Sequence, residues 1–179
     1  MIKTLIIATA MAITTQTADA ASEKTIIGKT DAKSLNTKVM TPEALWAMGR
    51  IAASAPSPDG KYVVYQVGYY SVKENRSHHV LYTIKYDGSE NKLLTATADN
   101  ETDPVWIENG KRIAFISNAS GSAQVWTMAP DGTDRKQMTN DKLDIAGFKV
   151  SPDGKRVILI KELPYNDIIQ PKYDDLPKA

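Results

Sequence analysis

The chain has 179 residues, of which 22 are basic and 21 acidic, so its formal net charge is +1 at pH 7. The charges are spread along the chain, which argues against a nucleic-acid-binding or polybasic membrane-surface protein, because such proteins carry a strong basic excess. Apolar residues make up 42% of the chain, and with glycine added this is the composition of a soluble globular domain. The chain has no cysteine and only two histidines, so disulfides, thiolate metal sites and cysteine nucleophiles are excluded.

The first twenty residues have the pattern of an export signal. Lys3 is a minimal positive n-region, residues 5–13 are a short apolar run, and Ala18-Asp19-Ala20 is an A-x-A cleavage pattern. The apolar run is too short to span a bilayer. We therefore expect a signal peptide at 1–20, cleavage after Ala20, export to the periplasm or beyond, and no membrane anchor afterwards. An N-terminal core strand or helix is the alternative.

Residues 21–40 are polar, lack a sustained period and are expected to be a lead-in. Thr41-Pro42-Glu43 then has the pattern of a helix start, with a hydroxyl N-cap, a proline in the first turn and an acid near the positive end of the helix dipole. The segment 41–53 is expected to hold a short helix of about two to three turns and a connection. Gly49 weakens this helix.

From residue 54 the chain repeats a pattern of turns and apolar runs. A turn with glycine precedes each of the runs YVVY (62–65), IAFI (113–116) and VILI (157–160). A second turn interleaves with the first, and its two copies are about 44 residues apart. The predicted turn residues are Asp59, Gly60, Asp87, Gly88, Asn109, Gly110, Asp131, Gly132, Asp153 and Gly154.

Each repeat is therefore expected to contain strand, turn, strand, loop, strand, turn and strand. Asp-Gly and Asn-Gly suit tight hairpins because these residues tolerate positive φ. Apolar runs that do not alternate predict strands buried on both faces. The sequence thus predicts an all-β fold, an incomplete β-propeller of about two and a half four-stranded antiparallel blades. Blade 1 is expected at 54–97, blade 2 at 98–145, and an incomplete third blade with a truncated end at 146–179.

Two acidic clusters are candidates for metal binding. Asp99, Glu101 and Asp103 lie close together, and the segment 131–134 loosely resembles a calcium loop, but neither has the ligand spacing or the terminal glutamate of that loop. We interpret both clusters as turn chemistry and solvated blade edges. No metal or cofactor is expected.

The two histidines, His78 and His79, are neighbours in the sequence. Neighbours on a strand point to opposite faces, so they do not clasp one metal ion together. A polar position between loop and strand is the expectation for both.

No catalytic residue is expected. The only glycine-serine cluster, at 118–123, does not match the G-x-S-x-G nucleophile elbow and is interpreted as a hairpin loop. Phosphate-binding and dinucleotide-binding glycine motifs are also missing. Core packing between blades and a ligand-stacking platform are both considered for five aromatic residues: Trp46, Trp106, Trp126, Tyr69 and Tyr70.

Several segments together carry a family resemblance: the signal peptide, MTPEALW (40–46), SPDGK (57–61), KENRS (73–77) and DDLPKA (174–179). This combination resembles the start of secreted bacterial prolyl oligopeptidase-family serine peptidases, in the branch of the dipeptidyl peptidases 5 and acylaminoacyl peptidases. The resemblance covers essentially the whole chain after the signal peptide. Ile107-Glu108-Asn109 departs from the Ser-Pro-Asp pattern of the other repeats but keeps the Asn-Gly turn.

The resemblance implies a two-domain enzyme in which the propeller shields a C-terminal α/β-hydrolase domain with the catalytic Ser, Asp and His. None of these three is in this chain. The implied role of the propeller is to exclude folded proteins and to admit oligopeptide substrates. A homodimer of the full-length enzyme is a further implication.

Two other interpretations stay open. The first is a periplasmic protein-binding propeller similar to TolB, without enzymatic activity. TolB-like proteins carry a separate α/β domain before the propeller, whereas only a short lead-in precedes blade 1 here, which favours the peptidase. The second is a small free-standing β protein. A third blade that stops in mid-blade argues against it, since propellers close with about four to eight blades.

Overall fold

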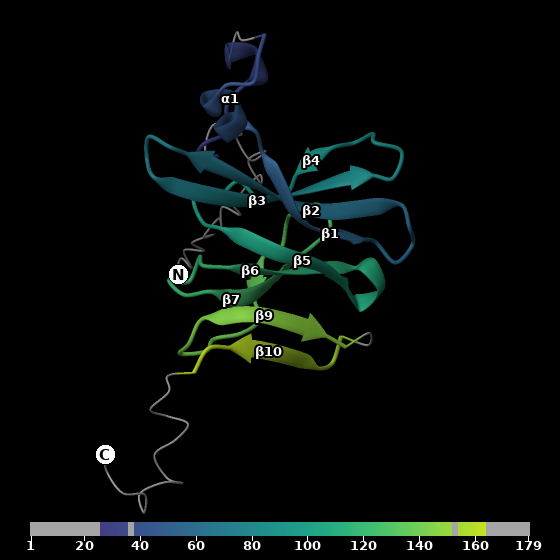
Figure 1. Ribbon diagram of the computed structural model, residues 1–179. Coiled ribbons are helices and arrows are strands. Elements are labelled where there is room, and N and C mark those ends of the chain that lie inside the picture. Colours follow the sequence, from purple (N-terminus) through teal and green to yellow (C-terminus); the bar gives the residue numbers. More distant parts are fainter. Residues whose placement is uncertain (1–25, 36–37, 152–153, 164–179) are drawn as a thin grey trace, which may run out of the picture.

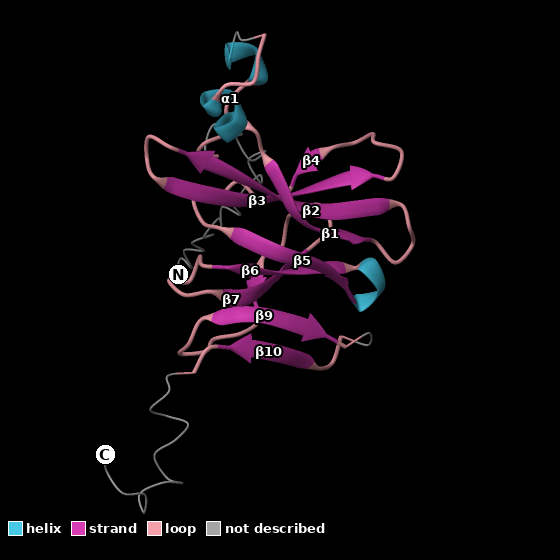
Figure 2. Ribbon diagram, viewed as in Figure 1, coloured by secondary structure: helices cyan, strands magenta, loops and turns pink. Residues whose placement is uncertain are grey.

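The computed structural model describes residues 26–35, 38–151 and 154–163. The strands within these ranges form three antiparallel sheets, which follow one another as layers in Figure 1 and are magenta in Figure 2. The predicted all-β propeller architecture is confirmed, with the ring of blades open rather than closed.

Each of the first two sheets is a four-stranded blade in sequence order. Blade 1 consists of β1 (Arg50–Pro56), β2 (Tyr62–Ser71), β3 (Arg76–Lys85) and β4 (Lys92–Leu93). Blade 2 consists of β5 (Glu101–Ile107), β6 (Arg112–Ser117), β7 (Gln124–Met128) and β8 (Lys136–Gln137). The third sheet pairs β9 (Ile145–Val150) with β10 (Val157–Lys161). The 3-10 helices η2 (Ala32–Leu35) and η3 (Glu108–Gly110) lie outside the strands.

The helix predicted before blade 1 is α1 (Pro42–Ala47), which is shorter than expected. Its N-cap is Thr41, whose Oγ1 accepts the Ala44 N–H at 3.2 Å. The cap satisfies one of the free N–H groups of the first turn, and the proline at the start has no N–H to satisfy. Within the described ranges, no helix is long and apolar enough to cross a membrane.

The chain passes close over β2 directly after this helix. A Cβ atom at Gly49 would lie 2.8 Å from side-chain atoms of both Tyr69 and Val67. Only glycine fits at such an approach without displacing a neighbour. The strand β1 starts immediately afterwards at Arg50, four residues before the expected start of blade 1 at residue 54.

The main core lies between blades 1 and 2. Val64 and Leu81 of blade 1 pack with Ile113, Phe115 and Met128 of blade 2, and all five side chains are fully buried. Burying each contributes about 1.5–3 kcal/mol, so this interface is the principal source of stability in the described part of the chain. A second cluster, which includes Phe148, joins blade 2 to the third sheet.

The expectation of strands buried on both faces holds for β6, in which every residue after Arg112 is buried. It is wrong for β10, where burial alternates and Ile158 and Ile160 are 69% and 56% exposed. The reason is that β6 lies in the middle sheet of three. In the described part of the chain, β10 has a packed sheet on one face only.

The face of blade 1 that points away from blade 2 is covered in part by the N-terminal segment. Ile26 is buried there against Val67, Val80 and Tyr82. Gly28 has a φ of +79°, and a Cβ atom on it would lie 2.6 Å from backbone carbon of β2. The end of the predicted lead-in is therefore packed against blade 1.

Candidate functional site

The predicted turns lie between successive antiparallel strands. Asp59-Gly60 connects β1 to β2, Asp87-Gly88 connects β3 to β4, Asn109-Gly110 connects β5 to β6, and Asp131-Gly132 connects β7 to β8. Gly154 lies between β9 and β10, whereas Asp153 and the predicted cleavage residue Ala20 lie outside the described residues.

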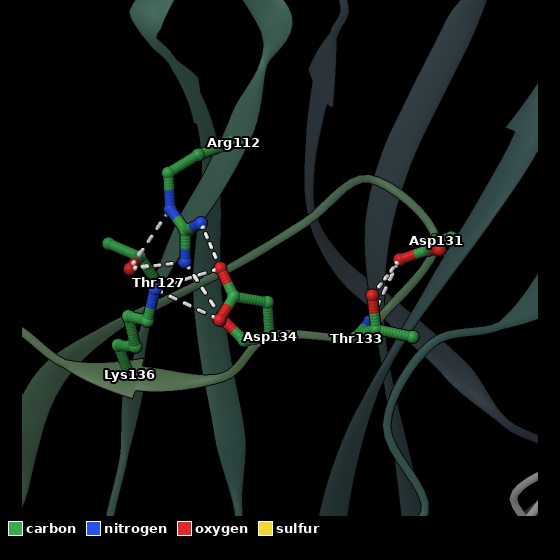
Figure 3. A network of polar contacts seen from close by, with 6 residues as sticks. All are labelled: Arg112, Thr127, Asp131, Thr133, Asp134 and Lys136. Atoms are coloured by element: carbon green, nitrogen blue, oxygen red, sulfur yellow. Dashed lines mark hydrogen bonds and ion pairs between the residues drawn. The ribbon is translucent and has the colours of Figure 1, made fainter. Parts of the chain in front are cut away.

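The turn aspartates are occupied by local hydrogen bonds. Oδ1 of Asp87 accepts the N–H of Ser89 at 2.9 Å and its hydroxyl at 2.7 Å. Oδ1 of Asp131 accepts the N–H of Thr133 at 2.9 Å and its hydroxyl at 2.6 Å (Figure 3). The hydroxyl hydrogen bonds are the largest cause of the lowered pKa of both aspartates. These carboxylates are ionised structural acceptors of the turns.

Gly132 is the turn position where substitution is expected to cost most. Its φ is +91°, and a Cβ atom would lie 2.7 Å from the carbonyl oxygen of Leu94 in blade 1. Gly60 is the matched control, because it has a φ of +69° but no atom within 4 Å of the same position. We expect Gly132→Ala to lower the free energy of unfolding by about 2–3 kcal/mol and Gly60→Ala by about 1–2 kcal/mol, measured by urea denaturation. Equal losses would show that the close contact with Leu94 adds nothing to the cost of Gly132→Ala.

Glu101 is not at a solvated blade edge, which corrects the expectation from sequence. Its side chain is fully buried, and Oε1 accepts the Thr97 hydroxyl at 2.6 Å and Nη2 of Arg135 at 3.0 Å. Burial is the largest influence on this carboxyl and raises its pKa, while the Thr97 hydrogen bond and the Arg135 charge oppose it. Arg135 also lies over the ring of Phe115, 5.3 Å from the centroid. The pair ties the first strand of blade 2 to its last turn.

His78 lies within β3 and is fully buried, whereas a polar position between loop and strand was expected. Its Nδ1 accepts the N–H of Ile27 at 3.0 Å, and its Nε2 then donates to the carbonyl oxygen of Asp99 at 3.0 Å. Both nitrogens are thus used to attach the N-terminal segment and the β4–β5 loop to blade 1. The imidazole is structural because neither nitrogen is left to accept a substrate proton.

His79 points to the opposite face of β3, where its Nδ1 lies 2.9 Å from Nε2 of Gln66. Burial, and secondarily the neighbouring His78, lowers the pKa of His79. It is therefore neutral at physiological pH. In the described part of the chain no three His, Asp or Glu residues are grouped to hold a metal ion.

The aromatic residues considered as a platform are divided among separate places. Trp106 and Trp126 pack against the core between blades 1 and 2, as the core-packing alternative expects, and Tyr69 packs against the cluster around Ile26. Trp46 is 5.9 Å from Tyr70, centroid to centroid, and the Arg50 guanidinium lies over both rings. Trp106 donates its indole N–H to the carbonyl oxygen of Ala55 at 3.0 Å, between blades. Trp126 lies beneath Arg135. A single stacking surface is therefore not formed.

A network around Arg112 closes the turn end of blade 2 (Figure 3). Nη1 of Arg112 donates to Oδ2 of Asp134 at 2.8 Å, and Nη2 donates to the Thr127 hydroxyl at 3.0 Å. Lys136 also contacts Asp134, 3.0 Å from Oδ1. The hydrogen bond from Arg112 is the largest cause of the lowered pKa of Asp134.

Two of the hollows between the described sheets are lined by the turn residues and by the first strands. The first has a volume of about 460 Å³ and opens between blades 1 and 2, lined by Tyr62, Thr83, Glu90, Asn91, Lys92, Trp106, Pro130 and Asp131. The second has a volume of about 320 Å³ and lies along the first strand of each sheet, lined by residues of β1, by Asp103 to Val105 and by Ala146 to Lys149. The first strands thus share one side of the molecule, as the inner strands of a propeller do.

Two structural hydrogen bonds follow the repeat but are not among the features expected from the sequence. The Thr95 hydroxyl accepts the N–H of Leu81 at 2.9 Å, and the Thr139 hydroxyl accepts the N–H of Val125 at 2.9 Å. Both threonines follow the second turn of a blade at the repeat spacing of about 44 residues. That shared spacing is the signal that could have found them.

The comparisons with known proteins agree with this geometry. The TolB beta propeller domain family matches residues 24–173. The chain belongs to this family. Dipeptidyl-peptidase 5 of Porphyromonas gingivalis is 42% identical over 140 residues, covering 78% of this chain and 20% of that protein. Dipeptidyl-peptidase 5 of Porphyromonas endodontalis is 37% identical over the same length and coverage.

Solved structures show the same fold at low identity. An acylaminoacyl peptidase of Pyrococcus horikoshii matches with a TM-score of 0.57 and 16% identity over 74% of this chain and 20% of that chain. A putative TolB of Agrobacterium tumefaciens matches with a TM-score of 0.51 and 21% identity over 70% of this chain and 40% of that chain. The predicted resemblance to the propeller portion of prolyl oligopeptidase-family peptidases is confirmed. This TolB-family chain spans about a fifth of the length of the curated relatives.

Proposed function

We propose that this chain is the non-catalytic propeller part of an exported serine exopeptidase of the dipeptidyl or acylaminoacyl peptidase type. The observation that carries the proposal is the 42% and 37% identity to two dipeptidyl-peptidases 5 over most of this chain. In this role the propeller gates a C-terminal α/β-hydrolase domain and admits oligopeptides while excluding folded proteins.

The geometry supports a gate rather than a catalyst. The first strands of the three sheets line a common hollow, which is the place where a narrow propeller passage would limit the size of a substrate. Ser120 lies in the loop between β6 and β7, and its hydroxyl contacts only the Ser122 carbonyl oxygen, at 3.5 Å, among the described residues. No base in the described part of the chain hydrogen-bonds this hydroxyl to activate it as a nucleophile.

The purified chain alone is expected to hydrolyse no dipeptidyl or acylaminoacyl chromogenic substrate. The physical reason is that neither histidine is arranged as a base beside a serine. Release of the chromophore is measured against a buffer blank. Turnover that disappears in Ser120→Ala or His79→Ala would contradict the proposal.

A domain exchange tests the gating role directly. Residues 24–173 replace the matching segment of the Porphyromonas gingivalis dipeptidyl-peptidase 5, and the chimera is compared with the unmodified enzyme. We expect the folded chimera to cleave dipeptidyl reporters and to leave a folded protein substrate intact. A folded chimera that is inactive on reporters, or that degrades folded protein, would refute the gating role.

The similarity to TolB favours one other candidate, a binding propeller without a catalytic partner. The reading frame of the parent gene separates the two. A continuation through further blades into a G-x-S-x-G elbow supports the peptidase, and a continuation that closes the propeller without a hydrolase domain supports the binding protein.

Export is the remaining part of the proposal. It rests on the lysine, apolar run and A-x-A pattern of residues 1–20. Expression of the complete chain in a Gram-negative host, followed by N-terminal sequencing of the periplasmic protein, is expected to give Ala21 as the first residue. Retention of Met1 in the cytoplasmic fraction would refute it.

A further inference from the structure

The repeat places the same backbone positions around the hollow in blade 1 and around the Arg112 network in blade 2. Thr83 pairs with Lys92 across β3 and β4, and Thr127 pairs with Lys136 across β7 and β8. Both threonines are buried, each with 6% of its surface exposed. Thr83 and Thr127 are therefore equivalent positions of the two blades.

The neighbouring positions correspond as well. Glu90 and Asp134 each precede their β-strand lysine by two residues, and both have positive φ, at 52° and 51°. Tyr62 and Arg112 are the first residues of β2 and β6. In each blade, the residue two positions further along this strand pairs with the equivalent threonine. Tyr62 in blade 1 thus stands where blade 2 has an arginine.

In blade 2 the arginine fills this position and joins its polar groups. Arg112 donates to the Thr127 hydroxyl and to the Asp134 carboxylate, and it also donates to the Asp134 carbonyl oxygen at 2.8 Å (Figure 3). The guanidinium matches its surroundings because its N–H groups form a planar fork that reaches hydroxyl and carboxylate together.

In blade 1 the same place is a hollow. The hydroxyl of Tyr62 reaches Oε2 of Glu90 at 3.5 Å and makes no hydrogen bond to Thr83. Thr83 lines the hollow, and its hydroxyl has no side-chain hydrogen bond to any residue in the described part of the chain. Thr83 as a residue is more than nine-tenths buried, and its hydroxyl is available as an acceptor to a group that enters the hollow. The hollow is therefore lined by a hydroxyl and a carboxylate at the backbone positions whose counterparts bind a guanidinium in blade 2.

The other walls suit the same group. The half-buried ring of Trp106 lines the hollow beside the carboxylate-bearing turn residue Asp131. A guanidinium is attracted to the face of an aromatic ring, most strongly to tryptophan.

Two lysines beside the hollow are already engaged. Lys85 contacts Glu90, and Lys92 donates to the carbonyl oxygen of Asp131 at 2.9 Å. Blade 2 shows that a carboxylate at the position of Glu90 accepts two cations at once, because Asp134 contacts both Arg112 and Lys136. The lysines therefore leave room for a second cation at Glu90.

We propose that the hollow between blades 1 and 2 is a binding site for a guanidinium group, such as the arginine side chain of a peptide. The guanidinium donates to the Thr83 hydroxyl and to Oε2 of Glu90, as Arg112 donates to Thr127 and Asp134 in blade 2. It also stacks on Trp106. The site stands on the comparison of the two blades and does not depend on the proposed peptidase function.

Calorimetric titration of the full chain with N-acetyl-arginine amide tests the site. The neutral citrulline analogue is the matched ligand control, since it has the same shape without the charge. We expect saturable binding of the arginine compound with a dissociation constant of about 1 mM, and at least about tenfold weaker binding of the citrulline compound.

Two variants locate the binding. Thr83→Val keeps the shape but removes the hydroxyl, and we expect about three- to tenfold weaker binding. Tyr62→Arg copies blade 2 into blade 1, fills the hollow from within and is expected to abolish binding while raising the melting temperature. Ser120→Ala, in a loop at the opposite end of the sheets, is the control and is expected to bind as the unmodified chain does.

Circular dichroism establishes that each variant is folded before it is titrated, and Thr83→Val decides alone if Tyr62→Arg does not fold. Equal affinity for the arginine and citrulline compounds, no saturation at 20-fold the expected dissociation constant, or unchanged binding in Thr83→Val would each overturn the proposal.

Discussion

Replacing Arg135 with methionine is expected to lower the free energy of unfolding by about 3 kcal/mol at pH 7. The change leaves the carboxylate of Glu101 buried without its cationic partner, and it removes the guanidinium from the ring of Phe115. Methionine keeps most of the apolar stem, so lost packing is a small part of the effect. Urea denaturation measures the loss.

The pH dependence of this loss identifies its cause. Burial already raises the pKa of Glu101, and removing Arg135 takes away a group that lowers it, so the pKa rises further in the variant. Because the pKa of Glu101 is raised in the folded state, the protonated carboxyl does not destabilise the fold below the ordinary glutamate pKa of about 4.3. The destabilisation grows as the pH rises through the raised pKa and the buried carboxyl ionises. The destabilisation is therefore expected to be smaller at about pH 4 than at pH 7.

A second variant provides the control. Glu101→Gln keeps a side chain that hydrogen-bonds Thr97 but has no charge to leave unpaired. We expect Arg135→Met to cost about 1 kcal/mol in this background, with no dependence on pH. A loss of the same size in both backgrounds would assign the effect to packing instead of to the buried ion pair.

Replacing Phe115 with alanine is expected to lower the free energy of unfolding by about 3–5 kcal/mol. The ring is fully buried at the interface of blades 1 and 2, where it packs with Val64 and Leu81 from the opposite sheet. Removing it opens a cavity between two sheets whose backbones are held by hydrogen bonds and close poorly around it. The same urea denaturation reports the change.

Tyr86→Ala is the matched control, because this aromatic residue is 80% exposed. Its replacement is expected to change the stability by less than about 0.5 kcal/mol. A loss below 1 kcal/mol for Phe115→Ala would mean that the two blades do not depend on each other for stability, contrary to the packing described here.

The sequence predicts the blades well because their signals are local. An Asp-Gly turn requires a particular backbone conformation, and an apolar run requires burial, so both features are written into a few adjacent residues. The strands between the turns consequently fall where the repeat places them. The exceptions in burial are Ile158 and Ile160 of β10 and the YVVY run of β2, in which only Val64 is buried. They arise because burial depends on a neighbouring sheet and not on the strand itself.

The candidate sites depend on contacts between residues that are distant in the sequence, and the sequence pattern does not predict such contacts. Glu101 reads as one acid among several, and only its approach to Arg135 explains its burial. His78 reads as a polar residue near a loop, yet its two nitrogens bind backbone groups from two other segments. The position equivalent to Arg112 becomes informative only when Tyr62 is aligned with it through the strand register.

The N-terminal segment that covers blade 1 gives the stack of sheets two unlike ends. At one end Ile26 is buried on the outer face of blade 1, and Lys29 lies near the rings of Tyr69 and Tyr82. At the other end β10 presents Ile158 and Ile160 uncovered in the described part of the chain. The uncovered face of the third sheet can therefore receive a further blade, whereas the outer face of blade 1 is already partly occupied by the chain's own N-terminal segment.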